Sequence, residues 1–167
     1  MHLSWWLDSL GKRLRVRRWR RRSRTIRPQV EICEDRTLLS VSASFFGPTG
    51  QLTVNVDAGE DVTIQADPSG NVEILVDGSV ANLLPPVGAG SVNSILLQGA
   101  DGASVFDVSG VTAAAGYQAG LGITLNGGHG DDTLIGSPDF ATVMDGGHGN
   151  DSIVGGTLDD TIDAGHG

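Results

Sequence analysis

Glycine and aspartate recur at a fixed spacing near the C-terminus of the chain. Residues 127–135 read GGHGDDTLI, residues 146–154 read GGHGNDSIV, and residues 155–163 read GGTLDDTID. The shared pattern is G-G-x-G-x-D-x-U-x, in which U is a large apolar residue. Ca²⁺ is a hard cation that binds roughly six to eight oxygen atoms from carboxylates and backbone carbonyls. A glycine-rich turn exposes carbonyl oxygens and the aspartate adds negative charge, so the pattern predicts turns that bind Ca²⁺.

The predicted metal-site residues are the glycines of each turn, which allow positive φ and close backbone approach, and the aspartate that follows them. They are Gly128, Gly130, Asp132, Gly147, Gly149, Asp151, Gly156 and Asp160. The short strand after each turn carries an inward-pointing U residue, namely Leu134, Ile153 and Ile162. A flexible linker rich in glycine and aspartate is the competing interpretation, but it would not repeat an apolar residue at one position of each nonapeptide.

These nonapeptides resemble the RTX, or hemolysin-type, calcium-binding repeats of secreted bacterial proteins. The resemblance covers about 40 of the 167 residues. It implies a parallel β-roll whose turns hold Ca²⁺ and in which two nonapeptides make one coil. Alternate blocks then share an edge of the roll: residues 127–135, 146–154 and 164–167 on one edge, and residues 136–145 and 155–163 on the other.

The resemblance also implies that a Ca²⁺ ion between two stacked turns takes an aspartate from each turn. Asp132 and Asp151 form such a pair. Block 136–145 has Ala141 in place of its aspartate, so we expect Asp160 to lack a partner and the chain to hold one complete site. The remaining carboxylates of the repeats are expected to be turn or solvent-exposed groups: Asp131, Asp139 and Asp159.

Positive and negative charge are segregated along the chain. All 11 Lys and Arg lie at or before Arg36, where four acids accompany them, so this part carries a charge of +7. Residues 37–167 hold 16 acids and no base, so their charge is −16. A segment this acidic attracts divalent cations and repels nucleic acid, so no nucleic-acid partner is predicted for it. Its many glycines and few aromatic residues favour a stacked solenoid over a large globular core.

Residues 1–43 form a basic segment with two recognisable features. Apolar residues recur at helical spacing from Leu3 to Leu14 and precede a dense arginine run. Residues 30–40, VEICEDRTLLS, resemble the LEPR-XLL segment that stands ahead of large secreted or surface repeat proteins. The residues that carry this resemblance are Glu34, Asp35, Arg36, Leu38 and Leu39.

Three interpretations of the basic segment are open: the positive region of an export signal, a basic amphipathic helix on an anionic membrane surface, and a nucleic-acid-binding arm. The LEPR-XLL-like residues favour export. The small residues Val41, Ser42 and Ala43 suit cleavage by signal peptidase, which predicts a mature chain that begins near Ser44. No run approaches about 18 apolar residues, so no transmembrane span is predicted. Cys33 is the only cysteine and cannot form a disulfide within the chain.

Residues 44–126 are predicted to be rich in strands. Residues 51–57 alternate apolar and polar side chains, and two further short stretches repeat this alternation between turn signals. Residues 95–108 look like a decayed repeat, with Phe106 at the U position and Ser104 in place of the aspartate. The predicted fold class is therefore all-β, with a β-solenoid leading into the roll and a small antiparallel sandwich as the alternative for this region.

Three histidines occupy the third position of their repeats: His129, His148 and His166. In a β-roll their side chains would stack about 4.8 Å apart, the spacing of neighbouring strands. Such a row either binds a transition metal or is an exposed position that was duplicated with the repeat. The chain contains no HExxH and no GxSxG motif, and we do not expect it to be an enzyme.

Together these residues predict a calcium-binding protein that is secreted or displayed on the cell surface. Its role would be that of a Ca²⁺-dependent structural or adhesive module, with Ca²⁺ and cell-surface or matrix components as partners. The alternative is the calcium-folding portion of an exported enzyme or toxin whose active domain lies outside this chain. The chain ends within a repeat, at residues 164–167, which predicts a longer protein. We expect residues 127–167 to be largely disordered without Ca²⁺, because their stacked carboxylates would repel one another.

Overall fold

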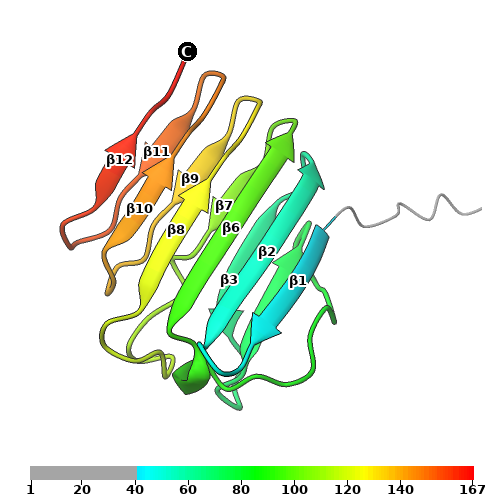
Figure 1. The fold of residues 1–167 in the computed structure, drawn as a ribbon, viewed down its shortest axis with the longest axis vertical. Coiled ribbons are helices and arrows are strands. Elements are labelled where there is room, and N and C mark those ends of the chain that lie inside the picture. The colour runs from blue at the N-terminus through cyan, green and yellow to red at the C-terminus, as the bar shows by residue number, and fades with distance from the viewer. Residues whose placement is uncertain (1–40) are drawn as a thin grey trace, which may run out of the picture. The chain divides into compact units, whose positions relative to one another are not determined.

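The computed structural model describes residues 41–167, which form two β-sheets of six strands each (Figure 1). The first sheet contains, in spatial order, β1 (Val41–Phe46), β2 (Gln51–Ala58), β6 (Ser94–Asp101), β8 (Gly122–Asn126), β10 (Thr142–Asp145) and β12 (Thr161–Asp163). The second sheet contains β11 (Ser152–Val154), β9 (Thr133–Ile135), β7 (Val105–Asp107), β3 (Val62–Ala66), β4 (Val72–Val76) and β5 (Ser79–Val80). One 3₁₀-helix, Ala89–Ser91, is the only helix of this part of the chain, so the all-β prediction is confirmed for it. The arginine run and the LEPR-XLL-like segment lie outside the described residues.

From β6 onward the chain changes sheet with every strand. Strands β6, β8, β10 and β12 pair in parallel in the first sheet, and β7, β9 and β11 pair in parallel in the second. Each connection from β6 onward therefore leads from one sheet to the other. Turns that leave the first sheet collect along one edge, and turns that leave the second sheet collect along the opposite edge (Figure 1).

Antiparallel pairing is confined to the N-terminal end of the described region. Strand β1 pairs with β2, β3 with β4, and β4 with β5 in antiparallel register. Between β4 and β5, Asp77 and Gly78 both have positive φ, 49° and 72°, which is the geometry of a tight two-residue hairpin turn. Strand β2 nevertheless pairs in parallel with β6, and β3 with β7. Both sheets are therefore mixed, and residues 44–126 do not form a wholly antiparallel sandwich.

The core consists of equivalent apolar side chains that stack in register across neighbouring strands. In the second sheet one row contains Val62, Phe106, Leu134 and Ile153. In the first sheet one row contains Val54, Leu97, Leu125, Met144 and Ile162. Phe106 and Leu134 are fully buried, which confirms Phe106 as the U residue of the decayed repeat. Burial of each such side chain stabilises the fold by roughly 1.5–3 kcal/mol.

The three U residues lie in the inward-facing rows, as predicted, but they are buried to different extents. Leu134 is fully buried and Ile153 is half-buried, whereas Ile162 is 51% exposed. Ile162 pairs with the buried Met144 and so shares its inward face, but it lies on β12 at the edge of the first sheet. Within the described residues no further strand covers it. Ile162 therefore shares the inward face, as predicted, and it is exposed because a side chain in such a row is buried only by neighbours on both sides.

Hydrogen bonds from two side-chain hydroxyl groups help to anchor the connection between β7 and β8, residues 108–121. The Tyr117 hydroxyl donates to the Gln65 carbonyl at 3.1 Å, and burial raises the pKa of Tyr117 to about 12. The Ser137 hydroxyl, fully buried, donates to the Val111 carbonyl at 2.6 Å. This connection therefore packs against the turn that follows β9. That turn lies on the edge opposite the glycine-rich turns of residues 127–132 and 146–151.

Candidate metal centre

Three glycine-rich turns stack along one edge of the two sheets. They are turn 1 (residues 127–132), turn 2 (residues 146–151) and turn 3 (residues 164–167). The His148 backbone N–H donates to the Gly128 carbonyl at 2.8 Å, which joins turn 2 to turn 1. The His166 backbone N–H donates to the Gly147 carbonyl at 2.8 Å, which joins turn 3 to turn 2.

The other two repeat blocks meet at the opposite edge. There the Thr142 backbone N–H donates to Asp160 Oδ1 at 2.7 Å, and the Thr157 hydroxyl donates to the Pro138 carbonyl. Alternate blocks thus share an edge, as the two-block coil predicted.

Four of the predicted site glycines adopt the left-handed backbone conformation that favours glycine. Their φ values are 93° for Gly128, 131° for Gly130, 90° for Gly147 and 135° for Gly149. The turns also stack so closely that a Cβ on Gly149 would collide with the Gly130 carbonyl oxygen. Gly156 has no positive φ, but a Cβ there would collide with the Ser137 carbonyl oxygen. The glycines are therefore required by the backbone geometry that brings successive turns together.

Asp132 and Asp151 occupy equivalent positions of turns 1 and 2, because the residues that follow them pair in the β9–β11 register. Each aspartate uses Oδ1 to accept a backbone N–H from the preceding turn on this edge. The Ser104 N–H donates to Asp132 at 2.8 Å, and the Asp132 N–H donates to Asp151 at 2.9 Å. The structure therefore brings together the pair of carboxylates that the sequence predicted.

The second carboxylate oxygen, Oδ2, is buried in both aspartates and has no hydrogen-bond partner among the described residues. Burial raises the pKa of Asp132, which is 1% exposed; the Ser104 N–H opposes this shift, and the negative charges of Asp151 and Asp131 add to it. A buried acceptor without a donor costs roughly 1–3 kcal/mol, and more when it is charged. A cation is the partner that would remove this cost.

Each free oxygen faces a space that the first glycine of the repeat leaves open. A Cβ on Gly127 would lie 2.5 Å from Asp132 Oδ2 and 2.6 Å from the Gly146 carbonyl oxygen of turn 2. Gly146 repeats this arrangement with Asp151 Oδ2 and the Ala164 carbonyl oxygen of turn 3. A carboxylate oxygen and a carbonyl oxygen from successive turns therefore converge on each space. These are the oxygen types that Ca²⁺ binds, so the residues present fit the metal that the resemblance implies.

Asp151 and Ala164 also line a hollow between turns 2 and 3. The hollow has a volume of about 280 Å³ and is lined by Gly149, Asn150, Asp151, Ala164, Gly165 and Gly167. Turn 3 contributes backbone atoms to it but no aspartate, as the sequence indicated. Between turns 1 and 2 both turns contribute an aspartate: Asp132 Oδ2 lies at the space beside Gly127, and Asp151 Oδ1 accepts the Asp132 N–H.

The sequence pattern did not single out Gly127, Gly146 or Ala164 as site residues. The two glycines could have been found from the repeat, because each is the first G of its nonapeptide. Its lack of a side chain makes room beside the free carboxylate oxygen. The carbonyl of Ala164 carries no such signal, because any residue type presents a backbone carbonyl.

Asp160 differs from the other two repeat aspartates because both of its carboxylate oxygens are satisfied. Its Oδ1 accepts the Thr142 N–H at 2.7 Å, and its Oδ2 accepts the Gly156 N–H at 2.6 Å. The partner position across this edge is therefore Thr142 and not Ala141, so the predicted alignment of block 136–145 was wrong by one residue. The extra residue of that block is taken up before β10, which shifts the alignment. Thr142 carries no carboxylate, so Asp160 still has no acidic partner there.

The remaining repeat carboxylates that the structure describes hold turns or face solvent. Asp131 accepts the Asn150 backbone N–H at 2.8 Å, and Asp139 accepts the Ala113 backbone N–H at 2.9 Å. Asp159 is exposed. Asp131 and Asp139 are therefore turn carboxylates, as predicted.

Within residues 41–167 no group of three or more His, Cys, Asp or Glu side chains is arranged to hold a metal ion. This finding does not bear on the turns, because a site made of backbone carbonyls and one or two carboxylates contains fewer such side chains.

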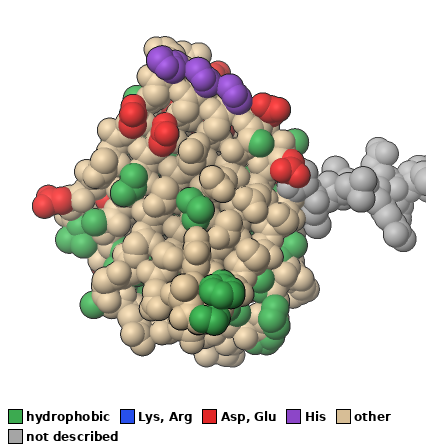
Figure 2. Space-filling view, in the orientation of Figure 1, with side chains coloured by type: hydrophobic (Ala, Val, Ile, Leu, Met, Phe, Trp, Pro, Cys, Tyr) green, Lys and Arg blue, Asp and Glu red, His purple; other side chains and the backbone are tan. Residues whose placement is uncertain are grey.

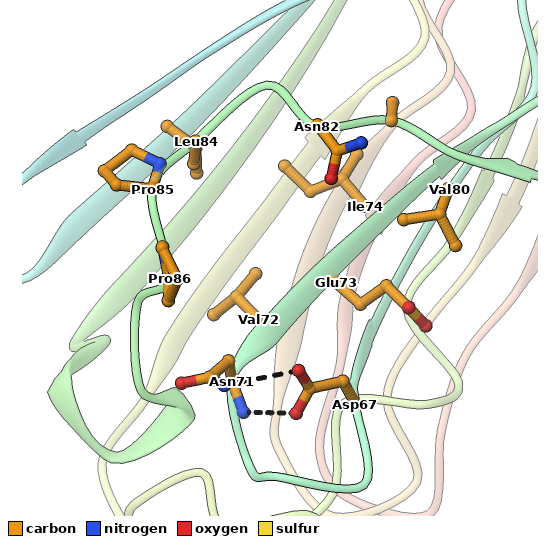
Figure 3. Close-up of a pocket in the computed structure, with 11 residues that line it drawn as sticks. Asp67, Asn71, Val72, Glu73, Ile74, Val80, Asn82, Leu84, Pro85 and Pro86 are labelled. Atoms are coloured by element: carbon orange, nitrogen blue, oxygen red, sulfur yellow. Dashed lines mark hydrogen bonds between the residues drawn. The ribbon is translucent and has the colours of Figure 1, made fainter.

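A separate hollow of about 240 Å³ lies between the β3–β4 turn and the proline-containing loop that follows β5 (Figure 3). Asp67, Asn71 and Glu73 line one side of it, and Pro85 and Pro86 line another. The Asp67 carboxylate accepts the Asn71 backbone N–H at 2.9 Å and the Asn71 side-chain N–H at 3.2 Å, and these bonds lower the pKa of Asp67. Asp67 thus shapes its turn, and it lacks the free buried oxygen that distinguishes Asp132.

No protein-family model, curated protein or solved structure matches this chain. Among residues 41–167, no helix has the length and apolar character needed to cross a membrane.

Proposed function

We propose that this chain is a calcium-binding repeat protein of the RTX type, in which Ca²⁺ links successive turns along one edge of the two sheets. The observation that carries the proposal is the pair of buried Oδ2 atoms of Asp132 and Asp151, each without a protein partner and each facing a carbonyl of the next turn. Asp132, Asp151 and the carbonyls of turns 1 to 3 would hold the metal. The ion would supply positive charge that neutralises the two carboxylates.

The glycines have a supporting role in this proposal. Gly128, Gly130, Gly147 and Gly149 keep the turns close enough for one ion to reach oxygens from two of them. Gly156 and Asp160 belong to the opposite edge, where hydrogen bonds already satisfy the carboxylate, so we assign them to stabilising the turn and at most to a weak site.

The alternation of strands between two sheets supports a parallel β-roll as the architecture of the C-terminal repeats. Strands β8 to β12 alternate between the sheets, and equivalent residues stack in register. The parallel pairs β2–β6 and β3–β7 support extending the solenoid into the preceding strand-rich region. Strands β1, β4 and β5 then flank the solenoid as antiparallel additions.

For the biological role we propose a Ca²⁺-dependent structural or adhesive module, secreted or displayed at the cell surface, that meets cell-surface or matrix components. The acidic repeats and the LEPR-XLL-like residues ahead of them support this assignment. The alternative is the calcium-folding portion of an exported enzyme or toxin. We prefer the structural role because residues 44–126 contain no recognisable catalytic motif.

Calorimetric titration of the full chain with Ca²⁺ tests the metal site. Asp132→Asn and Asp151→Asn keep the side-chain size and the Oδ1 acceptor but remove the charge. Each should weaken Ca²⁺ binding on the order of tenfold or more, because the number of charged ligands sets Ca²⁺ affinity over several orders of magnitude. Asp139→Asn is the matched control, since this exposed carboxylate accepts the Ala113 N–H away from turns 1 to 3.

Two outcomes would contradict the assignment. The first is that the wild-type chain takes up no Ca²⁺ at millimolar concentration. The second is that the Asp139 control loses as much affinity as the Asp132 and Asp151 variants.

A further inference from the structure

The third residues of turns 1 to 3 form a row of imidazole rings on the surface. His129, His148 and His166 are parallel bridge partners in sequence, and all three are exposed. The ring centroids of His129 and His148 are 4.7 Å apart with the planes 3° from parallel. Those of His148 and His166 are 5.1 Å apart with a 19° angle. Figure 2 shows the row as a continuous purple band, and the stacking predicted from the repeat is confirmed.

The row continues beyond the histidines to a carboxylate. Asp101, at the end of β6, is the parallel bridge partner of His129 and is exposed. One acidic and three imidazole side chains therefore occupy successive places on the same edge. Further acidic side chains lie near both sides of the purple band in Figure 2, and residues 37–167 carry no Lys or Arg. The potential around the row therefore favours cations.

We propose that this row is a binding site for a divalent transition-metal ion, of the class of Zn²⁺, Ni²⁺ and Cu²⁺, and that it is distinct from the calcium site of the turns. Imidazole nitrogen is a preferred ligand of these metals, whereas Ca²⁺ binds oxygen. The free oxygens of Asp132 and Asp151 are buried between the turns, while the three rings are exposed, so the two kinds of site need not compete.

The geometry favours an ion shared by two neighbouring rings. With metal–nitrogen bonds of about 2.1 Å and a tetrahedral angle, two ligating nitrogens lie about 3.4 Å apart. Equivalent atoms of the stacked His129 and His148 rings are separated by about the centroid distance of 4.7 Å. Each ligating nitrogen must therefore move less than about 1 Å toward the other. Each ring must also tilt out of the stack, because an imidazole nitrogen binds a metal in the plane of its own ring and these two planes are nearly parallel. The rings are exposed, so such a tilt disturbs no core packing.

The backbone holds the row ready for this tilt. The Gly130 N–H donates to the His148 carbonyl, and the Gly149 N–H donates to the His166 carbonyl, each at 2.8 Å. The Cα positions of the ligands are therefore fixed by the stacked turns, and only side-chain torsions remain to be ordered when a metal binds. His148 belongs to both neighbouring pairs, whereas His129 and His166 each belong to one.

The test is a calorimetric titration with Ni²⁺ in the presence of millimolar Ca²⁺, which keeps the calcium sites saturated throughout. The background is the full chain with Cys33→Ser and His2→Ala, so that these two other soft ligands do not contribute. His129, His148 and His166 are each replaced by threonine, which suits a strand-like row. The circular dichroism spectrum of each variant in Ca²⁺ shows that the fold is kept.

We expect His148→Thr to weaken Ni²⁺ binding about 100-fold or more, because it leaves no neighbouring pair and removes the gain from two linked ligands. His129→Thr and His166→Thr each leave one pair and should change the affinity only a few-fold. A folded His148→Thr variant with wild-type Ni²⁺ affinity would overturn the proposal, as would a wild-type row that binds no Ni²⁺. The circular dichroism spectra show whether the turns are folded, so both results are read on folded protein whether or not the turns bind Ca²⁺.

Discussion

The backbone N–H of Asp132 donates a 2.9 Å hydrogen bond to Oδ1 of Asp151. Asp151 therefore has two functions in one side chain: one oxygen fastens turn 2 to turn 1, and the other is buried without a partner. Asp132 repeats this arrangement one step earlier, with the Ser104 N–H as its donor. Under the proposed function the same carboxylate joins two turns and supplies a ligand oxygen. This would couple the stability of the fold to metal binding, and several variants separate the two effects.

Asp132→Asn should stabilise the metal-free protein while weakening Ca²⁺ binding. Without metal, the ionised Asp132 carboxylate is buried with a free oxygen and is repelled by Asp151 and Asp131. The amide keeps the acceptor for Ser104 and removes the charge, so we expect a gain on the order of 1 kcal/mol in the free energy of unfolding. Circular dichroism and urea denaturation in a chelator measure this gain, which should appear as more ordered repeats, because the metal-free wild-type repeats are expected to be largely disordered. A clear loss of order or stability there would show that the charge does not destabilise the metal-free state.

The stability of the metal-free protein should also depend on pH through Asp132. Its pKa is raised in the folded state above the ordinary 3.8, so the folded state binds the proton more tightly than the unfolded state. The resulting stabilisation is fully present below about the ordinary value and is lost as the pH rises through the raised folded pKa. The stability difference between Asp132→Asn and wild type should therefore shrink as the pH falls through this window, which denaturation at a series of pH values in chelator measures. A stability difference between the two proteins that stays constant with pH would contradict the raised pKa of Asp132.

Asp160→Ala should destabilise the protein without a large effect on Ca²⁺ affinity. Its two oxygens accept the Thr142 and Gly156 backbone N–H groups, so its removal leaves both donors without their partner. We expect a loss of about 1–3 kcal/mol in Ca²⁺-free buffer, by the usual cost of hydrogen bonds to charged groups. Asp151→Ala is the comparison, because its main effect should be on the Ca²⁺ titration. If Asp160→Ala proved the more damaging of the two to Ca²⁺ binding, the metal would sit at the opposite edge.

Gly149→Ala should destabilise the fold far more than Gly120→Ala. Both glycines have positive φ, 135° and 87°, so both substitutions carry the conformational cost, roughly 1–2 kcal/mol. Only at Gly149 would the new Cβ collide with a carbonyl oxygen, that of Gly130, while nothing lies within 4 Å at Gly120. Thermal unfolding in Ca²⁺ measures the difference. Equal melting temperatures would mean that the turns are not stacked as closely as the structure shows.

Protein recovered outside the cell should begin at or before Val41. Residues 41–43 belong to β1, where Val41 is 5% exposed and pairs with Val56, so a cut after Ala43 would remove half of this strand. The structure therefore moves the expected cleavage point upstream of Ser44. N-terminal sequencing of secreted material decides the matter, and a start at Ser44 would show that the rest of β1 is dispensable.

Much of the fold could be predicted because the repeat length determines how strands and turns alternate. Phe106 aligns with Leu134 at the U position, and Asp132 aligns with Asp151 in the turns, with no tertiary information needed. The alignment of Asp160 could not be predicted in the same way. An extra residue in block 136–145 can be absorbed at several places, and the choice depends on the β10–β12 register that places Thr142 opposite Asp160.

The burial of individual side chains depended on neighbours that a local pattern does not contain. Ile162 matches Leu134 in the repeat but lies on an edge strand, and its exposure follows from that position alone. The space beside Gly127 and Gly146 could not be predicted either, because the carbonyl of the next turn borders it and their own repeat supplies only the aspartate.

The placement of turns on two opposite edges gives this architecture a parity rule. Gain or loss of two neighbouring blocks returns every later residue to its own edge and leaves the imidazole row and the paired carboxylates in line. Gain or loss of one block would send all later turns across to the other edge, where Asp160 and Thr142 now meet, and would separate His148 from His129. The number of repeat blocks in such a chain can therefore change by two or another even number without loss of these rows, but not by an odd number.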